Sequence, residues 1–237
     1  FNLINKFSLE EELFAKSVNQ EVLESEIVGR TDLRNETIFT IDSESTKDID
    51  DAISIKKIKD DYLLGVHIAD VSYYVKEDSI LDKAAFNRGT SVYLADSVIP
   101  MLPKALSNGI CSLNPKVNRL TLTCEMQINK KGEVVKYSIY PSVINSKYKM
   151  TYTNINKMLN NDQEIIEEYS DIYQDVLLMQ ELQNILFDIR EKMGSIDFET
   201  LEPKLLFDEH GKLSDIVIRE RQTAERMIEE FMLVANQ

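Results

Sequence analysis

The sequence has no apolar run long enough to cross a membrane, and it contains few cysteines. We find no basic-then-apolar leader at its start, so neither membrane insertion nor export is expected. Two cysteines, Cys111 and Cys124, cannot build a disulfide framework in a chain of 237 residues. Both are therefore expected to be reduced, in a cytoplasmic protein. Internal repeats and low-complexity segments are also lacking.

Positive charge is scarce as well. The 27 basic residues face 41 acidic ones, which gives a formal net charge of −14. A polyanion is usually met by a basic surface, so this balance argues against nucleic-acid binding unless cations or basic modules elsewhere compensate. The chain opens on Phe1 and ends inside a helical pattern at Gln237, so we expect it to belong to a longer protein.

What the sequence does contain is an acidic segment, TIDSESTKDIDDA, at residues 40–52. Its flanks, residues 37–41 and 52–55, are apolar and rich in β-branched side chains, which predicts strand ends on both sides. Like charges this close repel one another, so the segment is stable only if solvent separates them or a cation draws them together. The carboxylates concerned are Asp42, Asp48, Asp50 and Asp51.

Several kinds of site are compatible with such a segment. A solvated surface loop is the commonest explanation of an acidic cluster. Against it, strand ends can hold ligands rigidly, and Lys47 is the only lysine among the carboxylates. A helix-loop-helix calcium site counted from Asp42 is excluded, because Lys47 replaces the turn glycine and Ile53 the bidentate glutamate. An all-oxygen site suits magnesium or manganese, and such sites most often serve phosphate chemistry.

The acidic segment and five later segments resemble, in the same order, blocks of the ribonuclease II and RNase R family. These proteins share the RNB catalytic domain of processive 3′ to 5′ exoribonucleases. The later segments are GVHIADV (65–71), RGTSVYL (88–94), IPMLP (99–103), CSL (111–113) and IEEFMLVAN (228–236). We expect residues 1–27 to form a linker helix and residues 28–237 the N-terminal portion of an RNB domain, truncated at its C-terminal side. The blocks do not separate ribonuclease II from RNase R.

The resemblance implies hydrolysis of single-stranded RNA from its 3′ end to nucleoside 5′-monophosphates. It also implies that Asp42, Asp48 and Asp51 hold Mg²⁺, or Mn²⁺ in its place, and that the chemical step depends most on Asp50. Cold-shock-type and S1-type RNA-binding modules are expected to flank the domain. The family also uses a later arginine and glutamate to hold the scissile phosphate. No segment of this chain matches that part, so the four aspartates could be present in an inactive piece.

Four further residues gain a role in RNA binding from the resemblance. Tyr93 would stack on a base near the reactive 3′ end and limit how short the product becomes, with Phe198 as a second aromatic clamp. Arg88 would contact a phosphate, and Glu230 a nucleotide close to the cleavage site. On the residues alone, Tyr93 is a strand residue, Phe198 a core residue, Arg88 an ion-pair partner and Glu230 part of a solvated helix edge.

Two other classes of protein stay open. One is a non-catalytic RNA-binding or scaffold relative that keeps the fold, which loss of metal binding would distinguish. The other is an acidic domain that binds a cation for structural reasons only. For a lone histidine in a strand, such as His67, a hydrogen-bonded core residue is the commoner situation.

The expected fold is α+β, with twisted antiparallel sheets covered by helices, because runs of strands are followed by runs of helices. A strand pair turns at residues 59–61, and a second pair joins 120–128 to 135–139, where Pro141 should end the pairing. Helices are expected after the capping box at Ser8, at 79–88 before Gly89, within 162–193, and at 224–235. A last hairpin would join 205–208 to 214–218 through a turn with His210.

Overall fold

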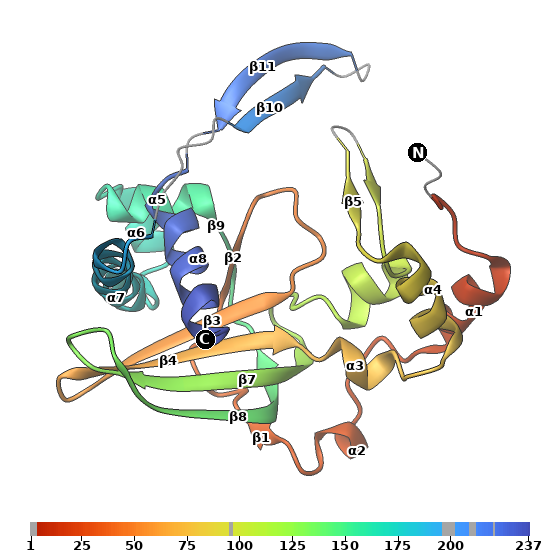
Figure 1. Cartoon of the computed structure of the whole chain (residues 1–237), viewed down its shortest axis with the longest axis horizontal. Coiled ribbons are helices and arrows are strands. Elements are labelled where there is room, and N and C mark those ends of the chain that lie inside the picture. The colour runs from red at the N-terminus through yellow and green to blue at the C-terminus, as the bar shows by residue number, and fades with distance from the viewer. Residues whose placement is uncertain (1–3, 95–96, 196–201, 209–211, 220) are drawn as a thin grey trace.

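The computed structural model describes residues 4–94, 97–195, 202–208, 212–219 and 221–237. Its main element is a five-stranded sheet with strand order β1-β8-β7-β4-β3 (Figure 1). Neighbouring strands are antiparallel, except that β1 runs parallel to β8. The strands are β1 (Thr31–Asp32), β3 (Asp51–Ile58), β4 (Asp61–Ala69), β7 (Asn118–Ile128) and β8 (Val134–Asn145). The α+β prediction is confirmed.

Both predicted strand pairs are present as hairpins. The β3–β4 turn places Lys59 at φ 54°, and Gly132, at φ 73°, lies in the β7–β8 turn. The prediction that pairing ends at Pro141 is wrong, because Pro141 lies opposite Leu122 and β8 continues beyond it. At Pro141 the strand forms an edge of the sheet, since β1 pairs only with Ser142 and Val143. An edge strand tolerates a residue without an N–H group.

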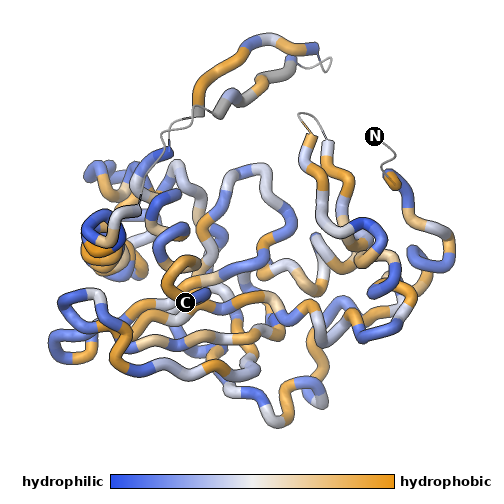
Figure 2. Tube along the Cα trace, in the orientation of Figure 1, coloured by the Kyte–Doolittle hydropathy of each residue, from blue (hydrophilic) through white to orange (hydrophobic). Residues whose placement is uncertain are grey.

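Helices cover one face of the sheet (Figure 1). The predicted stripe within residues 162–193 forms two helices, and its apolar side packs on β3, β4 and the last helix. Figure 2 shows apolar residues along the central strands and on α7. The helices are α5 (Tyr152–Leu159), α6 (Gln163–Glu168), α7 (Tyr173–Lys192) and α8 (Thr223–Ala235). The α5 helix was not among the helices predicted from the sequence.

A second group of helices surrounds the start of the chain. The capping box at Ser8 begins α1 (Leu9–Ser17), and α4 (Ile80–Arg88) runs from the N-cap Ser79 to Gly89 at φ 74°. The α1 helix packs on α4, with Ala15 and Leu81 fully buried together. The remaining short elements here are α2 (Glu24–Ile27), α3 (Val71–Tyr74), β5 (Val92–Tyr93), β6 (Val98–Ile99) and a π-helical turn η1 (Leu106–Ile110).

Three further strand pairs lie in the described residues, and one of them is the antiparallel pair of β5 and β6. Strand β2 (Thr40–Asp42) pairs in parallel with β9 (Lys149–Thr151), which joins two distant parts of the chain. Strands β10 (Glu202–Phe207) and β11 (Leu213–Arg219) form the predicted last hairpin. Its predicted turn at His210 lies outside the described residues. No helix in the described ranges has the length and apolar character that a membrane span requires.

His67 on β4 is a buried core residue, as the sequence predicts, with 2% of its surface exposed. Its Nε2 is hydrogen-bonded to Ser54 Oγ at 3.0 Å and its Nδ1 to Thr123 Oγ1 at 2.8 Å. A Cβ at Gly65 would lie only 2.4 Å from Ser54 Oγ, so glycine leaves the space that this network needs. Burial lowers the pKa of His67 to about 3, because the imidazolium form loses its hydration.

The lowered pKa of His67 predicts an acid-sensitive contribution to stability. Between about pH 6.5 and 3 the unfolded chain binds a proton at His67 and the folded chain does not. The free energy of unfolding should therefore fall by up to about 1.4 kcal/mol for each pH unit below 6.5. A His67→Gln variant lacks this component, so its stability should approach and then exceed that of wild type as pH falls.

Urea unfolding of both proteins at pH 7, 6 and 5 measures the effect as a difference of unfolding free energies. Carboxylates titrate in the same range, but they are common to both proteins and cancel in that difference. A difference that stays constant from pH 7 to pH 5 would contradict a neutral, buried His67.

Candidate active site

The residues between the ends of β2 and β3 form a single loop, residues 42–51, which we call the acidic loop. Asp42 is the last residue of β2 and Asp51 the first of β3, so both lie at rigid strand ends, as predicted. Asp50 is anchored through its backbone, because its carbonyl accepts a hydrogen bond of 2.9 Å from Ala69 N–H at the end of β4. The acidic loop is therefore held by the sheet at its C-terminal end.

Burial and repulsion from neighbouring carboxylates raise the pKa of three aspartates of the acidic loop, Asp42, Asp50 and Asp51. Burial raises the pKa of Asp42 to about 6 and that of Asp51 to about 6, and the negative charge of Asp50 adds to both shifts. Asp42, Asp48 and Asp51 are half-buried, whereas Asp50 reaches the surface. The pKa of Asp50 is nevertheless raised, by loss of solvent on its inner side and by the charge of Asp48. This cluster thus favours binding of a proton or a cation.

The Asp51 carboxylate has one oxygen without a hydrogen-bond partner among the residues that the structure describes. Its Oδ2 is buried and makes no hydrogen bond to any described residue. An unpaired buried carboxylate oxygen is costly, and the pairing that it needs is with a donor or a cation. All four side chains offer oxygen ligands, the type that Mg²⁺ and Mn²⁺ prefer. The donor set therefore fits a hard divalent cation.

The carboxylates are not yet gathered around one point. In the described part of the chain, no three Asp, Glu, His or Cys side chains are close enough to hold one ion as they stand. Two of the four aspartates are hydrogen-bonded to hydroxyl groups. Asp48 Oδ2 accepts from Tyr93 Oη at 2.6 Å, and the Asp42 carboxylate is hydrogen-bonded to Thr46. Side-chain rotation within the acidic loop would be needed to bring all ligands to one ion.

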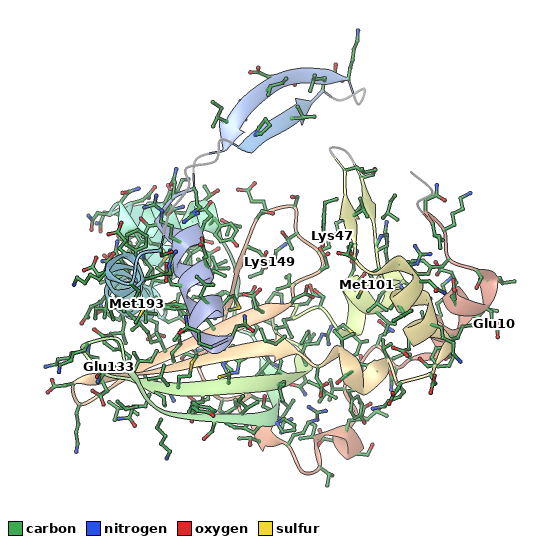
Figure 3. The ribbon with its side chains drawn as sticks, in the orientation of Figure 1. Glu10, Lys47, Met101, Glu133, Lys149 and Met193 are labelled. Atoms are coloured by element: carbon green, nitrogen blue, oxygen red, sulfur yellow. The ribbon has the colours of Figure 1, made fainter. Side chains whose placement is uncertain are left out.

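Lys149 is the cation that the sequence analysis missed. From β9, its Nζ donates to the carbonyl of Thr46 and, at 3.3 Å, to that of Glu44. In the view of Figure 3 it lies within the arc of the acidic loop, with Lys47 on the outer side. The positive charge of Lys149 also lowers the pKa of Asp42 against the effect of burial. The interpretation that only Lys47 accompanies the carboxylates is therefore wrong. Lys149 reaches the loop through the β2–β9 pairing, which no local pattern in the sequence indicates.

Of the two predicted RNA-binding residues Tyr93 and Arg88, the first contacts the acidic loop and the second contacts the N-terminal segment. Tyr93 is 64% exposed, so the face of its ring is open, and its hydrogen bond to Asp48 raises the pKa of the phenol to about 12. The Arg88 guanidinium donates to the backbone carbonyls of Ile4 and Lys6 and stacks on Phe7, 3.8 Å from its ring centroid. Arg88 thus fastens the N-terminal segment and makes none of the ion pairs found among the described residues, while its contact with a phosphate stays a prediction.

Glu230 differs most from its prediction on the residues alone. It is not part of a solvated edge, because only 3% of its surface is exposed. Its carboxylate accepts hydrogen bonds from Arg190 Nε at 2.9 Å and from Arg190 Nη2, which joins α8 to α7. An arginine fork meets a carboxylate in two parallel bonds and offsets its burial. Phe198, the other predicted RNA contact, lies outside the described residues.

The fold and the acidic loop together define a domain with a carboxylate-rich site at the strand ends of an α+β sheet. The family model described as "RNB domain" matches residues 30–237, and the chain belongs to this family. The match begins close to residue 28, where the resemblance of the sequence blocks also begins.

Two relatives and one solved structure illustrate the similarity. Ribonuclease R 1 of Lactococcus lactis is 50% identical over 237 residues, and Ribonuclease R of Thermotoga maritima is 52% identical over 225. The matches cover 100% and 94% of this chain but only 29% and 32% of those proteins. The structure of Mycoplasma genitalium RNase R with ribose-methylated single-stranded RNA superposes with a TM-score of 0.89, at 32% identity, over 99% of this chain and 36% of that one.

Proposed function

We propose that this chain is part of the catalytic domain of a 3′ to 5′ exoribonuclease that hydrolyses single-stranded RNA to nucleoside 5′-monophosphates. The observation that carries the proposal is the acidic loop, with four carboxylates on or between two strand ends and an unpaired buried oxygen on Asp51. Its setting in an RNB domain supports the choice of RNA as substrate. The chain spans about a third of the length of its curated relatives, so activity belongs to the longer protein.

Asp42, Asp48 and Asp51 would hold Mg²⁺, with Mn²⁺ as a substitute. When bound, the ion stabilises negative charge on the phosphate and makes a coordinated water more acidic. The reaction joins a water oxygen to phosphorus and breaks the bond from phosphorus to the 3′ oxygen of the preceding nucleotide. The water proton leaves through a carboxylate or solvent, and the 3′ oxygen takes up a proton.

Asp50 is the carboxylate best placed to act on the attacking water. It is the most exposed of the four, so water can approach it, while its backbone is held by the end of β4. The raised pKa of Asp50 makes the carboxylate a better proton acceptor than an ordinary aspartate. We therefore assign Asp50 the orientation of the water and the removal of its proton.

Tyr93 would bind the base next to the cleavage site, and its replacement should change the length of the final product. Stacking of one base on an aromatic ring contributes about 1–3 kcal/mol, so Tyr93→Ala should release short RNA earlier and leave a longer end product. Tyr93→Phe keeps the ring and should leave the end product at wild-type length. Gel analysis of 5′-labelled oligo(A) digests measures both; equal end products for Ala and wild type would contradict the stacking role.

Arg88 and Glu230 remain proposed RNA contacts, and each would first have to leave or share its present partner.

The net charge of −14 calls for compensation when RNA binds, and cold-shock-type and S1-type modules in the longer protein would supply it. Structures of Mycoplasma genitalium RNase R contain single-stranded or double-stranded RNA, which supports RNA as the partner. Two free cysteines fit the cytoplasm as the compartment.

The experiment that tests this function is digestion of 5′-labelled oligo(A) by the protein in its natural length, with magnesium. A ladder that shortens from the 3′ end, with nucleoside 5′-monophosphates as products, is expected. RNA bound without cleavage would instead indicate a non-catalytic RNA-binding relative. No RNA binding, with equal thermal stabilisation by calcium and magnesium, would indicate a structural cation site.

A further inference from the structure

The segment CSL at residues 111–113 has no role in the function proposed above, yet it touches the acidic loop. Ser112 is completely buried. Its Oγ accepts a hydrogen bond of 3.1 Å from Ile49 N–H and donates one of 2.8 Å to the carbonyl of Lys47. These two groups lie on either side of Asp48 in the chain. One hydroxyl group therefore bridges the backbone across this aspartate.

The contact of Ser112 with the loop is reinforced by its neighbour in the sequence. Leu113 N–H donates to the carbonyl of Ile49 at 2.9 Å, and the side chains of Leu113 and Ile49 are both fully buried in one apolar cluster. The middle of the acidic loop is thereby fixed by two hydrogen bonds at Ile49 and by the packing of its side chain. Asp48 therefore lies between two residues, Lys47 and Ile49, whose backbone groups are held by hydrogen bonds.

A buried arginine, Arg119, fixes the backbone of Ser112 through a hydrogen bond. Arg119 Nε donates to the carbonyl of Ser112 at 2.7 Å, and its Nη2 donates to the carbonyl of Gly109 at 3.3 Å. Arg119 is 7% exposed and lies on β7, a central strand of the sheet. The position of Ser112 is thus tied to the sheet and does not depend on a mobile surface loop.

A loop of four carboxylates needs such a support, because repulsion between the charges favours conformations that spread them apart. The charge of Asp48 acts on both Asp42 and Asp50, so the direction of Asp48 affects the whole cluster. A ligand held in place before the ion arrives binds it with less loss of conformational entropy.

We propose that Ser112 is a positioning residue for the metal-binding carboxylates, which acts by bridging Lys47 and Ile49 and so fixes the backbone at Asp48. The proposal rests on the function proposed above, since it assumes that the acidic loop binds a divalent ion. It adds a residue outside the loop, which touches neither ion nor RNA, to the determinants of metal affinity.

A buried serine can also serve the stability of the fold alone, so the test needs a matched control. Ser142 provides it: this serine is equally buried, and its Oγ is hydrogen-bonded to Thr121 Oγ1 at 2.7 Å and to Thr123 Oγ1 at 2.6 Å. None of these contacts involves the acidic loop. Ser112→Ala and Ser142→Ala each remove one buried hydroxyl group, but only the first frees Lys47 and Ile49.

The experiment measures Mn²⁺ affinity without RNA, by electron paramagnetic resonance of free Mn²⁺, in the natural-length protein. Thermal unfolding checks that each variant is folded, and Ser112→Cys, nearly equal in size to serine but weaker in hydrogen bonding, provides a second variant. Exchange of backbone amides in residues 43–51 is followed by mass spectrometry. The magnesium concentration for half-maximal cleavage of oligo(A) is determined for the same proteins.

We expect Ser112→Ala to weaken Mn²⁺ binding by about 10- to 100-fold, the range typical of residues that orient metal ligands, with Ser112→Cys between it and wild type. Amide exchange in the acidic loop should quicken, and Ser142→Ala should match wild type in both measurements. Unchanged Mn²⁺ affinity in both Ser112 variants, or equal weakening in Ser142→Ala, would overturn the proposal. Absence of Mn²⁺ binding by wild type would overturn the proposed function itself, and this inference with it.

Discussion

Replacing Asp50 with Asn is expected to slow RNA cleavage by about 10²- to 10⁴-fold, the usual contribution of a positioned proton acceptor. The amide keeps the size of the side chain but cannot accept a proton from the attacking water. In the role proposed for Asp50, the carboxylate interacts with the water more strongly in the transition state than in the ground state, so RNA affinity should stay close to that of wild type. The change should therefore appear in the rate constant of a single turnover.

The matched control for Asp50→Asn is Glu44→Gln, which removes one negative charge from the same loop. Glu44 is exposed, and Lys149 Nζ donates a hydrogen bond to its backbone carbonyl, which the substitution leaves in place. Single-turnover cleavage of oligo(A) and filter binding of the same RNA separate rate from affinity. Cleavage by Asp50→Asn at the wild-type rate would refute the assignment, whereas an equal loss in Glu44→Gln would reduce it to a general effect of loop charge.

Replacing Asp51 with Asn should make the metal-free protein more stable while abolishing its stabilisation by magnesium. The folded-state pKa of Asp51, about 6, lies above the ordinary value of 3.8. The folded state therefore binds the extra proton between these values, and stability is lost as pH rises through about 6. At pH 7 the charge of Asp51 costs about 3 kcal/mol, and the neutral amide removes that cost.

Magnesium should reverse the order of the two proteins. An ion bound only by the folded state stabilises it by about 4.1 kcal/mol at a concentration one thousand times its Kd, which exceeds the cost of the Asp51 charge. Wild type gains this stabilisation, and Asp51→Asn, which lacks a charged ligand, does not. The control is Asp60→Asn, which removes an exposed carboxylate paired with Lys130 at the β3–β4 turn.

Urea unfolding at pH 7, with chelator and then with magnesium, gives the free energy of unfolding of all three proteins. Asp60→Asn should respond to magnesium as wild type does. A metal-free Asp51→Asn protein less stable than wild type would contradict the unpaired state of this carboxylate. Retention of the full magnesium response by Asp51→Asn would remove it from the ligand set.

The parts of this molecule that the sequence predicts are those encoded by neighbouring residues. The N-cap Ser79 and the left-handed Gly89 mark both ends of α4, because capping uses hydrogen bonds within one turn. The acidic loop is likewise readable, since the β-branched runs on either side predict the strand ends that hold Asp42 and Asp51. The alternation in β7 predicts the hairpin with β8 for the same reason.

The contacts that the sequence did not predict join residues far apart in the chain. Lys149 reaches the carbonyl of Thr46 across 103 residues, through a parallel pairing that leaves no local pattern. Ser112 meets Ile49 across 63 residues. Glu230 was placed at a solvated edge because helical periodicity describes one helix at a time, and the arginine that buries it is on another helix. Local patterns thus predicted a loop of carboxylates between two strands but not the distant residues that support it.

The central claim is that the acidic loop binds the divalent ion of an RNA-hydrolysing site. Its most direct test is anomalous diffraction from a crystal of the natural-length Asp50→Asn protein grown with Mn²⁺ and a short oligo(A). We expect an anomalous peak in contact with carboxylate oxygens of Asp42, Asp48 and Asp51, with the 3′-terminal phosphodiester beside it. A peak elsewhere, with the acidic loop bare of metal, would contradict it.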